Sequence, residues 1–88
     1  MSELKNTRSI ELVQEETEVE EILHSVYKAL QTKGYDPVSQ IVGYIMSGDP
    51  TYITSYANAR YLISQVERDE ILEALLTVYI REVLDKKY

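Results

Sequence analysis

Apolar residues recur at the spacing of an α-helix over four stretches of this chain. Steps of three and four residues place them on one face of a helix between Val19 and Leu30, and again between Val38 and Ile45. The same steps return between Ala59 and Val66 and between Ile71 and Val83. The pattern therefore predicts an all-α fold, a small domain of four to five helices.

The predicted helix ends are marked by glycine and proline. All three glycines and both prolines of the chain lie between Lys33 and Pro50. Glycine adopts the left-handed conformation that follows a helix at little cost, and proline fits the first turn because no donor is needed there. The sequence therefore predicts two junctions, with a second helix between them over residues 37–47. The junction residues are Gly34, Asp36, Pro37, Gly48, Asp49 and Pro50.

The first two predicted helices carry further signals. Thr17 followed by Glu20 is a capping box, which is expected to begin the first helix. Tyr35 follows the glycine that ends this helix, and it is expected to contact Leu30. Gly43 lies in the middle of the second helix, where it costs about 1 kcal/mol relative to Ala. We expect the backbone of another helix, from the same chain or from a second copy, to pass close to it.

The third predicted helix begins at Thr54 or Ser55, either of which can cap it, and runs to about Val66. At about 100° per residue, its apolar stripe lies roughly half a turn away from the stripe of the last helix. A break is therefore predicted at residues 67–69, with Asp69 as a cap. The competing interpretation is one long helix that is clasped on two sides, as in an intertwined dimer.

Residues 1–16 differ from the rest because they show no sustained period. We expect them to form a flexible N-terminal arm, which leaves residues 17–88 as the helical domain. The alternative is a short strand or an extra helical turn that Ile10 and Leu12 hold on the domain. Within a flexible arm, the hydroxyl group of Thr7 is accessible to a kinase that binds extended chain.

Charge and cysteine content exclude several classes of function. Fifteen acidic and nine basic side chains give a net charge of −6, which repels a phosphate backbone and argues against nucleic-acid binding. With no cysteine and one histidine, the chain has neither a disulfide framework nor a zinc site of nitrogen and sulfur ligands. Its apolar runs are short, so we expect a cytoplasmic protein without a membrane span. All eight aromatic residues are tyrosines, which are typical of protein interfaces.

No group of side chains has the composition of a catalytic or cofactor site. His24 lies beside the apolar stripe of the first helix, where a partly exposed residue is expected rather than a base. The carboxylate pairs within residues 67–73 have helical spacing, which is more typical of a solvated face than of a cation site. In an acyl carrier the serine that holds the prosthetic group directly follows an aspartate, whereas here Asp36 is followed by Pro37 and the serine comes only at Ser39. We therefore expect neither enzymatic activity nor a cofactor.

A longer motif spans both junctions. The sequence GYDPVSQIVGYIMSGDPTYI at residues 34–53 resembles the signature GYNPxxQIVGYxxSGDPxYI of the IreB family, small regulatory phosphoproteins of Gram-positive bacteria. The likeness continues as EVxExLxxVYxxL within residues 18–30 and as ARxxIxxxERDEIxExL within residues 59–75. Asp36 stands where the family has Asn, and either side chain caps a helix. The signature residues are Gly34, Asp36, Pro37, Gln40, Gly43, Gly48, Asp49 and Pro50.

This resemblance implies a function that composition does not show. It implies a cytoplasmic helical homodimer whose flexible arm is phosphorylated on threonine by a membrane Ser/Thr kinase with extracellular PASTA repeats, with a cognate phosphatase acting in reverse. It also implies regulation of cell-wall synthesis and of cell-wall antibiotic tolerance. In related proteins the regulated step is degradation of the enolpyruvyl transferase of peptidoglycan synthesis by a Clp protease. Thr7 matches the arm threonine, and Ser9 is the other candidate acceptor.

The resemblance also indicates where a protein partner binds. Family members carry a basic stripe over the third helix, whereas only two of its arginines remain in this chain. We expect phosphorylation of the arm to weaken binding of the partner. The alternative is a structural or DNA-binding helix-turn-helix dimer, which needs a basic third helix. The residues expected to bind the partner are Arg60, Glu67, Arg68, Asp69 and Glu70. The basic stripe is replaced by Thr54, Ser55, Asn58 and Ser64.

Overall fold

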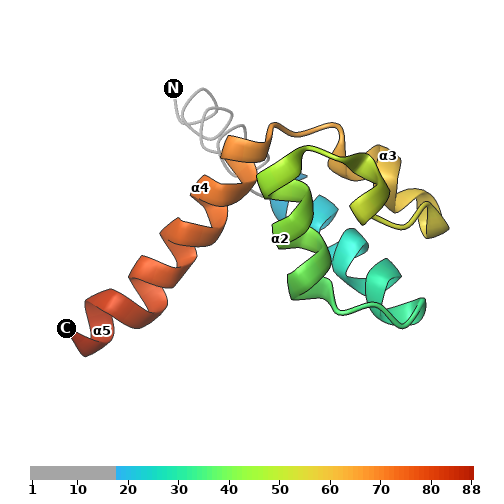
Figure 1. Cartoon of the computed structure of the whole chain (residues 1–88). Helices are drawn as coiled ribbons and strands as arrows, with labels where there is room; N and C mark the ends of the chain where they lie inside the picture. The colour runs from blue at the N-terminus through green and yellow to red at the C-terminus, as the bar shows by residue number, and fades with distance from the viewer. Residues whose placement is uncertain (1–17) are drawn as a thin grey trace, which may run out of the picture.

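The computed structural model describes residues 18–88, and this part of the chain consists of helices and turns without a strand (Figure 1). The predicted all-α fold is confirmed. The predicted arm over residues 1–16 and the predicted cap at Thr17 lie outside the described residues. The helices are a first helix described over residues 18–32, α2 (Pro37–Ser47), α3 (Ala59–Ile63) and α4 (Arg68–Tyr79), with 3-10 turns η1 (Pro50–Tyr52) and η2 (Tyr56–Asn58) between α2 and α3.

The first helix ends at the predicted glycine. Gly34 has a φ of +83°, a conformation that strains any residue with a side chain. Its N–H donates to Gln31 O at 3.0 Å, and the N–H of Tyr35 donates to Leu30 O at 2.9 Å. This pair of bonds is the Schellman motif, which satisfies carbonyl groups that the helix end leaves unpaired.

Helix α2 has the predicted bounds and both predicted caps. The Asp36 carboxylate accepts hydrogen bonds from the Ser39 N–H at 3.3 Å and from Ser39 Oγ at 2.6 Å, and Pro37 occupies the first turn. At the other end Gly48 has a φ of +74°, and its N–H donates to Tyr44 O at 2.7 Å. Local sequence therefore determines where this helix begins and ends.

The cap residues Asp36 and Asp49 make the stability of the fold depend on pH. The Asp49 carboxylate accepts hydrogen bonds from Thr51 Oγ1 at 2.7 Å and from the Thr51 N–H at 3.0 Å. The bond from the hydroxyl is the main reason that the pKa of Asp49 lies below its ordinary value of 3.8. The Ser39 hydroxyl lowers the pKa of Asp36 in the same way. Such carboxylates stabilise the fold above their unfolded pKa, and this contribution is lost as the pH falls through the lowered folded pKa.

We therefore expect the urea midpoint of the wild-type chain to fall as the pH is lowered below about 4. The double variant Asp36→Asn, Asp49→Asn keeps side chains that cap helices but removes both titrations, so its midpoint should fall less over the same range. Urea unfolding followed by circular dichroism at several pH values measures the difference. Equal pH dependence of the two proteins would show that the caps do not contribute to it.

The third helix begins later than predicted. Ala57 and Asn58 have φ values of 52° and 64°, in the left-handed region that an α-helix excludes. A 3-10 turn with Ser55 as its N-cap does begin at Tyr56, but this kink separates it from α3, which begins at Ala59 and ends before the predicted residue 66. Thr54 Oγ1 instead accepts a hydrogen bond from the Tyr56 N–H at 3.2 Å and so closes a turn.

The hydrophobic core lies where the first helix, α3 and the loop after α2 meet. Among the described residues nine apolar side chains are buried, and four of these come from the first helix. Ile53 from the loop and Ile63 from α3 have no exposed surface, whereas α4 contributes only Ile71. The nine are Ile22, Val26, Ala29, Leu30, Tyr44, Ile53, Ala59, Ile63 and Ile71.

Gly43 lies against the ring of Tyr52, so the predicted approach of another helix backbone from the same chain is wrong. A Cβ atom at Gly43 would lie 2.5 Å from Cδ1 and 2.8 Å from Cζ of Tyr52, which is closer than side chains pack. Turn η1 brings the ring there, and Gln40 of α2 fixes the turn by donating from Nε2 to Tyr52 O at 2.9 Å. Glycine thus allows an aromatic ring to lie directly on α2.

Replacing Gly43 by Ala is expected to lower the free energy of unfolding by about 1–3 kcal/mol, because the added methyl group displaces the ring. In a Tyr52→Ala background the same replacement is expected to raise it by up to about 1 kcal/mol, since Ala is the better helix former. A double-mutant cycle measured by urea unfolding tests this reversal of sign. The same effect in both backgrounds would mean that the ring does not explain the glycine.

The chain breaks between α3 and α4, as predicted. Glu67 has an extended backbone, with φ −74° and ψ 149°, and α4 begins at Arg68. The N-cap is Glu67, so the predicted cap at Asp69 is wrong, and Asp69 lies in the first turn. The Glu67 N–H donates to Glu70 Oε1 at 2.9 Å, which secures this helix start. The competing interpretation of one continuous helix across this region is also wrong.

Helix α4 continues through a π-helical turn (Ile80–Leu84) into α5 (Asp85–Lys87), and this long helix projects from the rest of the molecule (Figure 1). The sequence predicts an apolar stripe on it. Ile71 alone of that stripe is buried, and about half the surface of Leu72, Leu76 and Tyr79 is exposed. We call these three residues the α4 face. No other part of residues 18–88 covers it.

Candidate functional site

Two arginines that were expected to bind a partner have bonds inside the molecule. Arg60 is partly buried, and its Nε donates to Ile53 O at 2.8 Å. Arg68 donates from Nη1 to Ile45 O at 2.9 Å, near the end of α2. Its guanidinium also covers Gly48, where an added Cβ would lie 2.9 Å from Cζ. Both side chains therefore tie distant parts of the backbone together, a role that sequence spacing does not reveal.

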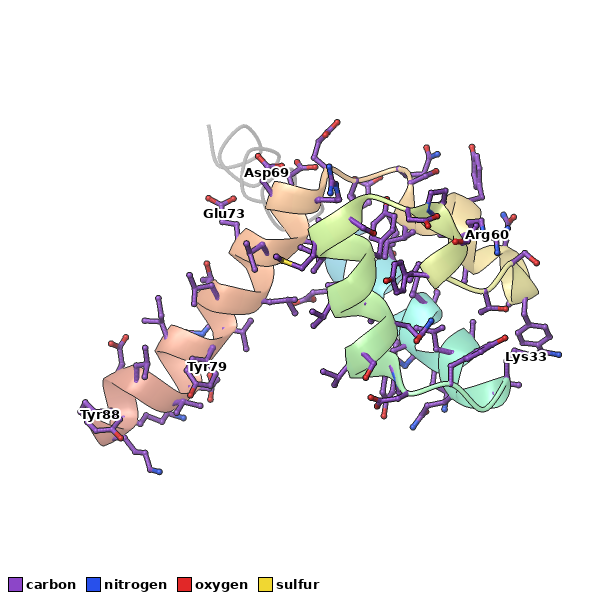
Figure 2. The ribbon with its side chains drawn as sticks, in the orientation of Figure 1. Lys33, Arg60, Asp69, Glu73, Tyr79 and Tyr88 are labelled. Atoms are coloured by element: carbon purple, nitrogen blue, oxygen red, sulfur yellow. The ribbon has the colours of Figure 1, made fainter. Side chains whose placement is uncertain are left out.

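The five residues expected to bind a partner do not form one surface. Those from 67 to 70 lie together at the start of α4, whereas Arg60 lies in α3 on the other side of the body from Asp69 (Figure 2). Glu67 and Glu70 secure the helix start, and Asp69 is exposed. The first turn of α4 is thus the accessible part of the predicted surface. The eight signature residues, by contrast, shape helix ends and the loop after α2.

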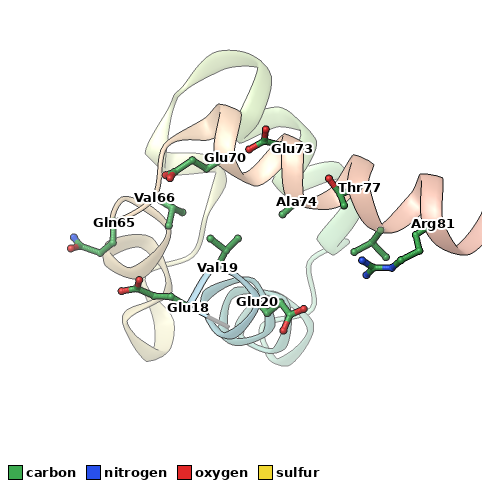
Figure 3. A pocket seen from close by; sticks show the side chains of 11 residues that line it. Glu18, Val19, Glu20, Gln65, Val66, Glu70, Glu73, Ala74, Thr77 and Arg81 are labelled. Carbon is green, nitrogen blue, oxygen red and sulfur yellow. The ribbon is translucent and has the colours of Figure 1, made fainter. Parts of the chain in front are cut away.

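A groove of about 520 Å³ lies between the first helix and α4 (Figure 3). In Figure 3, Val19 of the first helix and Ala74 of α4 face each other across it. The sequence pattern does not reveal this groove because its two walls are far apart in the chain. Its carboxylates are those of Glu18, Glu20, Glu70 and Glu73. An apolar hollow adjoins it and is lined by Leu23, Leu75, Tyr79 and Val83, among others.

The exposed apolar side chains are the second candidate surface. Besides the α4 face, helix α2 exposes Val38, Val42 and Met46 at steps of four residues, which places them along one side of that helix. Contiguous exposed apolar residues of this kind mark sites of protein contact. None of the helices in residues 18–88 combines the length and the apolar content that crossing a bilayer requires.

Helix α3 lacks the features of a helix that reads DNA. It has five residues, and the Nε of its basic residue, Arg60, is already bonded to backbone. The polar residues that replace the basic stripe serve local structure: Thr54 closes a turn, Asn58 is left-handed, and Ser64 Oγ donates to Tyr61 O at 2.6 Å. The arrangement favours contact with a protein over contact with nucleic acid.

Most of the sequence matches the profile of a known protein family. The profile of a family described as IreB regulatory phosphoprotein matches residues 5–81. The chain belongs to the IreB family. This membership agrees with the resemblance carried by the junction motif. The match begins two residues before Thr7, so both Thr7 and Ser9 lie inside it, although they lie outside the residues that the structure describes.

Relatives of this IreB-family chain carry the name UPF0297 protein. One from Lachnoclostridium phytofermentans is 54% identical over 88 residues, which cover 99% of this chain and 100% of the relative. Another, from Acetivibrio thermocellus, is 59% identical over 70 residues, 80% of this chain and 78% of the relative. A third, from Ruminiclostridium cellulolyticum, is 57% identical over 67 residues, 76% of each chain. The family description is that of a regulatory phosphoprotein and not of an enzyme.

Proposed function

We propose that this IreB-family chain is a cytoplasmic, non-enzymatic regulator of peptidoglycan synthesis, and thereby of cell-wall antibiotic tolerance, that is switched by phosphorylation of Thr7. The observation that carries the proposal is the family match, because it begins at residue 5 and so includes this threonine. A Ser/Thr kinase with PASTA repeats adds the phosphate, and a cognate phosphatase removes it. Ser9 is the alternative acceptor.

The unphosphorylated chain binds a protein partner, and phosphorylation weakens the complex. The partner contacts the first turn of α4, where Asp69 and Arg68 are exposed, and it contacts Arg60 separately on the other side of the body. A guanidinium has five donors, and a hydrogen bond to a backbone carbonyl occupies one of them in each arginine, so the others remain for a partner. The proposed partners belong to the machinery through which a Clp protease degrades the enolpyruvyl transferase. Glu67 and Glu70 hold this turn in place.

A homodimer covers the α4 face. Leu72, Leu76 and Tyr79 follow one another at steps of four and three residues, so they lie along one side of the helix. Two copies can pack these sides against each other about a two-fold axis. Each residue of the α4 face then occurs twice in the interface, once from each copy. The small core supports this proposal, because a domain of this size gains much of its stability from further apolar burial.

Phosphorylation of the full-length chain by the purified kinase domain tests the switch. The intact mass is expected to show one added phosphate on the wild type and on Ser9→Ala, and none on Thr7→Ala. A pull-down from cytoplasm with the wild type and with Thr7→Glu is then expected to recover a partner that binds the Thr7→Glu variant less. An unmodified wild type, or equal recovery of the partner by both proteins, would contradict the proposal.

A further inference from the structure

The groove between the first helix and α4 has the chemistry of a site for a peptide that is both basic and apolar (Figure 3). The carboxylates of Glu18, Glu20 and Glu73 line it and form no ion pair with any of residues 18–88. Arg81, the basic residue of the lining, is paired with Glu82 at 3.6 Å. The groove therefore combines an apolar floor with negative charge that is not neutralised.

We propose that residues 5–13 of the same chain dock in this groove and that a phosphate on Thr7 releases them; the release rests on the proposed phosphorylation of Thr7. The point of attachment favours this occupant, because Glu18 lines the groove and the arm leads directly to it. The nine residues between Arg8 and Glu18 span up to about 30 Å when extended. The wall of the groove between residues 70 and 81 extends only about 16 Å along α4 and the start of the turn after it. The arm therefore reaches every part of the groove.

The composition of the arm matches that of the groove. Lys5 and Arg8 lie on either side of Thr7 and supply the positive charge that faces the carboxylates. Apolar residues follow them and fit the apolar part of the groove lining, which includes Val19, Ala74 and Val78. Because the arm is tethered, its effective concentration at the groove is of millimolar order, so weak contacts suffice to hold it. The apolar residues are Ile10, Leu12 and Val13.

Phosphorylation reverses the electrostatic match. A phosphate on Thr7 adds a charge of about −1.5 to −2. Residues 5–13 contain Lys5, Arg8 and Glu11, so their net charge changes from +1 to about −0.5 to −1. The modified segment then meets the carboxylates of the groove as a like charge and leaves. Glu70 lies in the groove wall and in the first turn of α4, so the docked arm adjoins the proposed partner surface. Docking thus explains how a modification in the arm alters binding on the helical body.

A spin label on the arm of the full-length chain tests the docking. The protein has no cysteine, so Ser9→Cys gives a single site for a nitroxide. In the nitrogen-15 spectrum, the amide signals of Val19, Ala74 and Val78 are expected to broaden, while that of Tyr61 on α3 stays sharp. Adding Thr7→Glu to the spin-labelled chain is expected to raise the intensity of the three groove signals severalfold, toward the intensity that they have when the nitroxide is reduced.

A charge-reversal pair provides the matched control. Glu73→Lys changes a groove carboxylate and is expected to abolish most of the broadening. Glu21→Lys makes the same change on the first helix outside the lining of the groove, and it is expected to leave the broadening intact. Sharp groove signals in the spin-labelled wild-type arm, or equal effects of the two replacements, would overturn the docking.

Three further outcomes distinguish docking within one chain from docking between copies and from the proposed phosphorylation. In a mixed sample, one chain carries the nitroxide but no nitrogen-15, and the other carries nitrogen-15 but no nitroxide. Broadening that appears only in this mixed sample would assign the groove to the arm of a second copy and overturn docking within one chain. If the kinase modifies Thr7 but the groove signals stay sharp, the docking fails and the proposed function stands. If the groove signals broaden but the kinase leaves Thr7 unmodified, the docking stands and the proposed function fails.

Discussion

Replacing Ile63 by Ala is expected to lower the free energy of unfolding by about 2–5 kcal/mol. The side chain has no exposed surface, so its truncation leaves a cavity in the core. Helix α3 has five residues, too few to be stable by itself, and it is held by burial of Ala59 and Ile63. A domain of this length is stable by only about 4–13 kcal/mol, so the loss is a large fraction of the total.

Urea unfolding followed by circular dichroism measures this loss. Tyr61→Ala is the control, because Tyr61 lies on the same helix and has 59% of its surface exposed. It is expected to change the free energy of unfolding by less than about 1 kcal/mol. If the two variants were equally stable, α3 would not be held by the burial of Ile63.

Replacing Leu76 by Lys is expected to convert the proposed dimer to a monomer at micromolar concentration. Leu76 has 53% of its surface exposed in the single chain, so a two-fold contact buries the remaining half of the side chain in each copy. Two half-buried leucines contribute about 2–3 kcal/mol together, which corresponds to roughly a hundredfold in the dissociation constant. Two lysines facing each other add charge repulsion to this loss.

Sedimentation velocity over a range of concentrations measures the change. Thr77→Lys introduces the same charge one residue later, about 100° around the helix and away from the α4 face. It is expected to leave the dissociation constant unchanged within a few-fold. Loss of the dimer in both variants, or in neither, would place the contact between copies elsewhere on the molecule.

The parts of the fold that the sequence predicts well depend on local chemistry. Gly34 and Gly48 end helices because their backbone is left-handed, and Asp36 and Asp49 begin the next elements because their carboxylates accept nearby N–H groups. These requirements involve residues within a few positions of one another, so the motif itself contains them. The break before α4 is also a local signal, because the apolar stripe of residues 59–66 and that of residues 71–83 would lie on different sides of one straight helix.

The parts that sequence analysis misses depend on residues that are distant in the chain. Arg68 contacts the end of α2 and Arg60 contacts the loop after it, and nothing in their spacing separates these roles from partner binding. Gly43 is explained by a ring nine residues away. Ala57 adopts a left-handed backbone that its residue type does not favour, so its sequence gives no warning of the late start of α3.

The last helix illustrates a more general limit. Its apolar period predicts a helix correctly, but the period does not say whether the apolar side meets the core or a second molecule. Ile71 is buried while Leu72, one position later, is half exposed, although both belong to the predicted stripe. The groove on the other side of the same helix depends on where the first helix lies. Helical periodicity therefore identifies the surface, and only the tertiary arrangement shows that it is unoccupied within residues 18–88.

The π-helical turn at Ile80–Leu84 accommodates one residue more than an α-helical turn of the same rise would. A deletion of one residue in this turn would restore regular winding and rotate only the tail that follows. The family match stops at residue 81, inside the turn. A change in chain length within this turn therefore alters only the tail that follows it, while the upstream surface of α4 keeps its register.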